Sequence, residues 1–96
     1  MDEKDEKFIE SVVNAFYESG FIQEADRLSG FKAELVSGSR EIREQAAAKI
    51  IGFCHPKAWG DLAVYKKCDD FKTIGEWDNA LARLSKIARH SKPKNA

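Results

Sequence analysis

The chain lacks any apolar run close to the roughly 20 residues that a membrane-spanning helix requires. Its first residues, Met1-Asp2-Glu3-Lys4, are acidic and polar, whereas a signal peptide combines a basic start with an apolar segment. We therefore expect no membrane partner, and we predict a cytoplasmic protein.

Cysteine is scarce, with only Cys54 and Cys68 in 96 residues. The two could pair, but 43% of the residues are hydrophobic, so the core does not need a disulfide to hold it. We interpret both as reduced thiols. Neither lies in a recognisable local signature of a cysteine nucleophile, and we expect a protein that is not an enzyme.

The chain also lacks the spacing of a structural zinc site. The ligand types are present, but the adjacent side chains of Cys54 and His55 would have to approach one ion from divergent directions. The neighbouring carboxylates Asp69 and Asp70 are typical of a solvated loop. We expect no metal and no cofactor, although the available ligand types are Cys54, His55, Cys68, Asp69, Asp70 and His90.

Net charge is zero because 16 basic side chains balance 16 acidic ones, which gives no overall attraction to nucleic acid. The charges are unevenly distributed: residues 1–40 carry nine acidic and five basic side chains, and residues 41–96 carry seven acidic and eleven basic ones. The two halves either attract each other within one fold or offer an acidic face to a basic partner. For the second alternative, the expected contact residues are Glu10, Glu18, Glu24 and Asp26.

Four stretches carry apolar residues at helical spacing. The first predicts a helix from about Glu3 to Ser19, ended by Gly20. The second runs from Ile22 to Gly38 and could bend at Ser29-Gly30. The residues expected to face inward in these two helices are Phe8, Ile9, Val12, Val13, Phe16, Ile22, Ala25, Leu28, Phe31 and Leu35.

The third helix is expected to start at a Ser39 cap and to end before Pro56, and the last to follow a capping box made by Thr73 and Glu76. Between them, residues 57–72 show no clear period. The sequence predicts an all-α, compact, four-helix bundle-like single domain over 1–91, with an irregular connector before the last helix and a basic C-terminal tail at 92–96. The inward-facing residues of these two helices are Ile42, Ala46, Ile50, Phe53, Trp77, Ala80, Leu81, Leu84, Ile87 and Ala88.

Trp59 lies outside every helical stripe, in the connector. It either fills the end of the bundle or is an exposed anchor for a partner, because tryptophan and tyrosine are frequent at interface centres. Tyr17 and Tyr65 are open to the same two interpretations. The candidate anchors are Trp59, Asp61 and Tyr65.

Several local motifs resemble those of small helical bacterial proteins that confer immunity to secreted toxins. They are Ala25-x-x-Leu28, the alanine-rich stretch Ala46-Ala47-Ala48, the turn Trp59-Gly60-Asp61-Leu62 and the register Asn79-x-Leu81-x-x-Leu84. The resemblance implies a cytoplasmic inhibitor that binds one cognate toxin and blocks its active site or substrate groove, without turnover. Because toxins that attack nucleic acid tend to be cationic, an acidic face is what such an inhibitor would present.

A basic edge on the last helix supports an alternative. Clustered cations favour phosphate contacts, so the chain could be a small nucleic-acid-associated or regulatory protein. However, cations near the end of a helix also complement its dipole, and we rank nucleic acid as the less expected partner. The edge comprises Arg83, Lys86, Arg89, Lys92 and Lys94, with His90 beside them.

Overall fold

The computed structural model describes residues 2–55, 57–62, 64 and 71–91. Within this part of the chain there are four α-helices, one 3-10 turn and no strand, so the prediction of an all-α, four-helix bundle-like fold is confirmed. The elements are α1 (Glu3–Glu18), α2 (Ile22–Ser37), α3 (Arg40–Phe53), the 3-10 turn η1 (Trp59–Asp61) and α4 (Ile74–Ser91).

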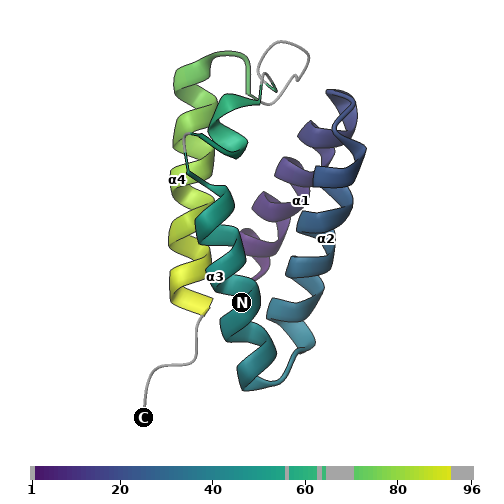
Figure 1. Cartoon of the computed structure of the whole chain (residues 1–96), viewed down its shortest axis with the longest axis vertical. Coiled ribbons are helices and arrows are strands. Elements are labelled where there is room, and N and C mark those ends of the chain that lie inside the picture. Colours follow the sequence, from purple (N-terminus) through teal and green to yellow (C-terminus); the bar gives the residue numbers. More distant parts are fainter. Residues whose placement is uncertain (1, 56, 63, 65–70, 92–96) are drawn as a thin grey trace.

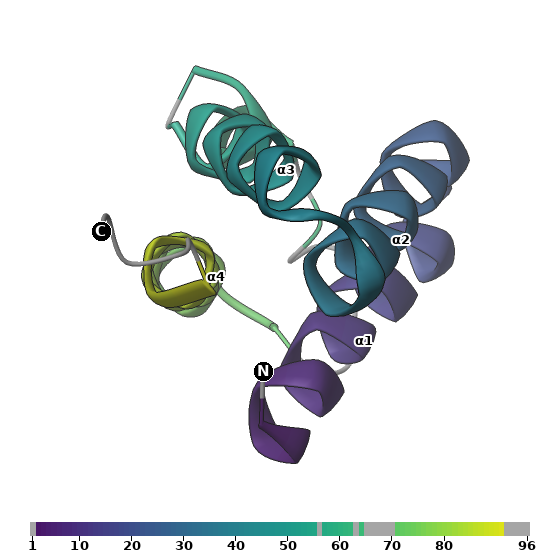
Figure 2. The same cartoon turned by 90° about the horizontal axis from the view of Figure 1, so that it is seen from below.

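The helices run alternately up and down, and each packs against the next along the chain (Figure 1). Seen from below, α4 is nearly end-on, whereas α1 and α2 are inclined to it (Figure 2). The turn between α1 and α2 lies at the upper end in Figure 1, and η1 lies at this same end. A hydrogen bond from the Ser19 hydroxyl to the Val64 carbonyl, 3.2 Å long, joins the two segments there.

α1 begins at Asp2, whose carboxylate accepts a hydrogen bond from a backbone N–H in the first turn. It ends as expected at Gly20, whose φ of 85° is a left-handed value that glycine adopts without steric cost. The N–H of Phe21 donates to the carbonyl of Phe16 at 2.9 Å, and the N–H of Gly20 donates to that of Tyr17 at 3.1 Å. With the Phe16 and Phe21 rings in contact, this is a Schellman motif, which fixes the path of the chain into α2.

The two predicted caps are present. The Ser39 hydroxyl accepts from the N–H of Ile42 at 3.3 Å at the start of α3. At α4, the Thr73 hydroxyl accepts from the N–H of Glu76 at 3.1 Å. The reciprocal half of the capping box differs, because the Glu76 carboxylate accepts from the N–H of Lys72 at 2.6 Å rather than from that of Thr73.

α2 runs without a break through Ser29-Gly30. Two residues expected to face inward are exposed instead: Ile22 at 50% and Ile42 at 41%. Both lie in the first turn of a helix, Ile22 at the start of α2 and Ile42 at the start of α3. The buried core is Ile9, Val12, Ala15, Phe16, Ala25, Leu28, Phe31, Leu35, Ala46, Ala47, Ile50, Trp59, Val64, Trp77, Ala80, Leu81, Leu84, Ile87 and Ala88.

Some sequence predictions fall outside the described residues. These are the anchor role of Tyr65, the basic tail at 92–96, and the side chains of Cys68, Asp69 and Asp70.

Candidate partner-binding surface

Trp59 connects three parts of the fold. Its indole N–H donates to the carboxylate of Glu24 on α2, and its backbone carbonyl accepts from the indole N–H of Trp77 on α4 at 2.9 Å. Its side chain is only 2% exposed. The interpretation of Trp59 as an exposed anchor is therefore wrong, and the alternative that it fills the end of the bundle is confirmed.

The burial of Trp59 follows from the rings around it. Phe53, at the end of α3, stacks on the indole with 4.9 Å between centroids and 14° between planes. Phe16 of α1 meets it edge-on at 5.1 Å, and Trp77 meets Phe16 in the same way at 5.5 Å. Helices α1, α3 and α4 therefore each place an aromatic ring in one cluster, and such pairs add stability beyond their buried area.

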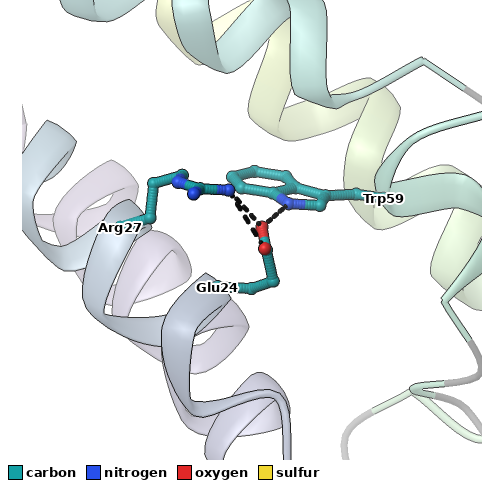
Figure 3. Close-up of polar contacts among 3 residues, drawn as sticks. All are labelled: Glu24, Arg27 and Trp59. Atoms are coloured by element: carbon teal, nitrogen blue, oxygen red, sulfur yellow. Dashed lines mark hydrogen bonds and ion pairs between the residues drawn. The ribbon is translucent and has the colours of Figure 1, made fainter.

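The carboxylate of Glu24 is held from two sides (Figure 3). Nη1 of Arg27, one turn further along α2, lies 3.0 and 3.3 Å from its two oxygens, and the Trp59 indole N–H approaches from η1. The guanidinium of Arg27 lies 5.0 Å from the centroid of the Phe53 ring. We call this group, formed by Phe53, residues 58–62 and the side chains of Glu24 and Arg27, the η1 corner.

The acidic residues proposed from the sequence do not share one face of the protein. Glu24 points toward η1, whereas Asp26, two residues later on the same helix, accepts a hydrogen bond from the Tyr17 hydroxyl of α1. Residues two apart project about 200° apart around a helix. Glu10 lies near the middle of α1. Its carboxylate pairs with Nζ of Lys32 at 2.7 Å, and this contact holds the pKa of Glu10 below its usual value.

Four of the proposed acidic residues nevertheless lie on segments at the same end of the bundle. We define the acidic end by Glu18, at the end of α1, Glu24 and Asp26, in the first half of α2, and Asp61 in η1. The side chains of Glu18 and Asp61 are exposed and make no hydrogen bond or ion pair within the described part of the chain. The acidic end therefore has two unpaired carboxylates and two that are held by neighbours.

Apolar side chains are also exposed on the helices that form this end of the bundle. Ile22 is 50% exposed and Tyr17 is 42% exposed. A shallow groove of about 360 Å³ runs over residues 20–24, and a hollow of about 210 Å³ lies beside it in the η1 corner, lined by Glu24, Phe53, Ala58, Trp59 and Leu62. Exposed apolar side chains with polar residues around them are a feature of protein–protein contact surfaces.

The structure gives little basis for other chemistry at the described residues. No group of three or more His, Cys, Asp or Glu side chains among them is placed to hold a metal ion. Burial raises the pKa of the Cys54 thiol to about 12, so this thiol stays protonated at neutral pH. None of the described helices is long and apolar enough to cross a membrane.

Sequence reasoning did not single out Arg27. The sequence does contain a pattern that could have identified this residue, because Glu24 and Arg27 have the spacing that favours an ion pair on one helix. The third partner, Trp59, follows Glu24 by 35 residues, and no local pattern connects the two.

Comparison with known proteins adds no assignment. No family model matches the sequence, and no curated protein and no solved structure matches it. The resemblance to immunity proteins therefore stays a prediction.

Proposed function

We propose that this protein is a non-enzymatic binding module that neutralises a basic partner protein, in the manner of a cytoplasmic bacterial immunity protein and its toxin. The observation that carries the proposal is the acidic end. There, the turn between α1 and α2 and the turn η1 place four acidic residues and the exposed side chains of Ile22 and Tyr17 at one end of the bundle. Charge would accelerate the encounter with a cationic partner, and the apolar groups would supply contact area.

The distribution of ion pairs supports this function. In the described part of the chain, ion pairs join neighbours on one helix or join α1 to α2. Apart from Arg40–Glu44, which spans the boundary between the two halves, none of them joins the acidic half to the basic half. Among the described residues, the excess negative charge of residues 1–40 is thus not neutralised by ion pairs with the second half of the chain, which supports a role in binding a partner.

The test uses the purified protein as bait in a lysate of its source cells, followed by identification and purification of what it retains. The test variant is Glu18→Lys/Asp61→Lys, which reverses the two unpaired carboxylates and leaves the Glu24 contacts in place. The control is Glu3→Lys/Glu41→Lys, which makes the same change in net charge at the other end of the bundle.

We expect a single basic protein whose own activity is inhibited by the wild type. Its dissociation constant should rise about tenfold or more with the test variant and with added salt, and change little with the control. Capture of nucleic acid in place of a protein, or equal binding by both variants, would rule the proposal out. The first of these results would favour the basic edge of α4 instead.

A further inference from the structure

A second feature lies away from the acidic end, between α1 and α4. The guanidinium of Arg83, on α4, lies over the ring of Phe8, on α1, with 4.2 Å to the ring centroid. Phe71 meets Phe8 edge-on at 6.4 Å, and Phe71 is itself in contact with the core residue Trp77 at 5.6 Å. The cation therefore rests on an aromatic surface that is anchored in the core.

These residues line an open groove of about 350 Å³. Two phenylalanine rings and an alanine form its apolar part. Asn79 lies one turn before Arg83 on α4 and contributes an exposed amide at the rim. The carboxylate of Glu76 also borders the groove, but it accepts a hydrogen bond from the backbone N–H of Lys72. The complete lining is Phe8, Phe71, Glu76, Asn79, Ala80 and Arg83.

Within the part of the chain that the structure describes, the N–H groups of Arg83 have no hydrogen-bond partner. Its guanidinium makes no hydrogen bond and no ion pair within the described residues, so stacking on Phe8 occupies one face of the group and leaves its donors free. A guanidinium that is stacked on a ring is pre-oriented, and its planar fork matches the two oxygens of a carboxylate. Lys86 follows on the same side of α4, so a second positive charge lies along this flank.

We propose that this groove is a binding site for a carboxylate attached to an apolar body. The two oxygens of the ligand would accept hydrogen bonds from Arg83, and its apolar part would pack on Phe8 and Phe71. A free organic acid and the C-terminal carboxylate of a protein chain ending in an apolar residue both have this chemistry. The site does not depend on the function proposed for the acidic end.

The test follows the backbone amide resonances of the whole chain by NMR during titration with 4-phenylbutyrate. Its neutral partner, 4-phenylbutyramide, and inorganic phosphate serve as comparison ligands. We expect 4-phenylbutyrate to shift the resonances of residues around Phe8 and Arg83, and to bind about tenfold more tightly than either comparison ligand. Equal binding of the acid and its amide would overturn the carboxylate assignment. Equal binding of phosphate would overturn the requirement for an apolar body.

Variants test the role of Arg83 directly. Arg83→Gln should weaken 4-phenylbutyrate binding about tenfold or more. Arg83→Lys, which keeps the charge and loses the planar fork, should weaken it by about threefold or more. The matched control Arg89→Gln removes an exposed cation from another side of α4 and should leave binding unchanged. If Arg83→Gln bound 4-phenylbutyrate as tightly as the wild type, or if Arg89→Gln lost as much affinity as Arg83→Gln, the proposed site would be wrong.

A final arm identifies the source of the carboxylate. It compares a tetrapeptide ending in phenylalanine, as the free acid and as the C-terminal amide, with 4-phenylbutyrate. Tighter binding of the free-acid peptide than of 4-phenylbutyrate assigns the site to a chain end, and the reverse order assigns it to a small organic acid. Binding of neither ligand would overturn the proposal.

Discussion

At the scale of single residues, the side chain of Trp59 has two separable roles. Its rings fill space between Phe16 and Phe53, and its N–H satisfies the Glu24 carboxylate. We expect Trp59→Phe to lower the free energy of unfolding by about 1–3 kcal/mol, because the Glu24 contact and some volume are lost. Trp59→Ala should cost about 3–5 kcal/mol, because a cavity is added.

Urea denaturation monitored by circular dichroism measures both variants. Val36→Ala, a truncation of an exposed apolar residue, is the control, and it should change the free energy of unfolding by less than about 0.5 kcal/mol. If Trp59→Ala behaved like this control, the buried position of Trp59 would be wrong.

The buried thiol of Cys54 gives a second prediction at this scale. Since burial raises its pKa to about 12, very little thiolate is present at neutral pH, and the thiolate is the reactive form. In a Cys68→Ser background, we expect alkylation of Cys54 by iodoacetamide to be about a hundredfold or more slower in the folded chain than in urea. Equal rates in the two states would show that Cys54 is accessible and ionisable.

At the scale of elements, two glycines are expected to respond oppositely to substitution. A Cβ at Gly30, within α2, would meet no atom within 4 Å outside the adjacent backbone of its own helix, whereas a Cβ at Gly38, after α2, would clash with the Glu34 carbonyl oxygen. Gly30→Ala should raise the free energy of unfolding by about 0.5–1 kcal/mol, because alanine favours a helix interior. Gly38→Ala should lower it by about 1–3 kcal/mol, because the backbone has to move.

Thermal denaturation of the two variants in parallel measures the difference. Stabilisation by Gly38→Ala, or a loss of stability in Gly30→Ala, would contradict the path of the chain around the end of α2.

The elements also show which parts of the fold the sequence allows one to predict. The starts of α3 and α4 at Ser39 and Thr73, and the stop at Gly20, depend on residues a few positions apart, and all three predictions are confirmed. The helical periodicity of apolar residues also depends on positions a few residues apart, and it identified the faces of the helices that point into the core. It failed at Ile22 and Ile42 because a stripe does not tell where the neighbouring helices end.

The candidate site was less predictable for a related reason. η1 is specified by contacts with Glu24 and Trp77, which lie 35 and 18 residues away from Trp59. The charge pattern singled out the acidic residues of the first half, but the helix geometry divides them between the two sides of α2 and pairs Glu10 with Lys32. The grouping of Glu18 with Asp61 becomes visible only when the elements are assembled.

At the scale of the whole molecule, two contacts couple the packing of α1 on α2 to pH. The hydrogen bond from Lys32 holds the pKa of Glu10 below its usual value, so this carboxylate stabilises the fold above its unfolded pKa, and the effect is lost as pH falls through the folded pKa. The hydrogen bond to Asp26 raises the pKa of Tyr17, so this phenol contributes below its ordinary pKa, and the effect is lost as pH rises through the folded value.

We therefore expect Glu10→Gln to lower Tm slightly at pH 7, and this difference from the wild type to shrink as pH falls below the ordinary pKa of a glutamate. Tyr17→Phe should lower Tm slightly at pH 7, and its difference should shrink as pH rises above the ordinary pKa of a tyrosine. Differential scanning calorimetry across this range measures both. A gap between wild type and Glu10→Gln that is the same at pH 3 and pH 7 would contradict the Glu10–Lys32 contact.

The position of both tryptophans also determines which events the intrinsic fluorescence of the protein can detect. The chain has two, Trp59 and Trp77, and they are hydrogen-bonded to each other at the η1 end. Excitation near 295 nm therefore reports on one region only, where the Glu24 carboxylate accepts a hydrogen bond from one of the two indole rings. Tryptophan emission should change when a ligand binds at the acidic end, and it should stay constant when a change is confined to the turn between α2 and α3. The native chain thus carries a built-in optical probe of the surface where we expect its partner to bind.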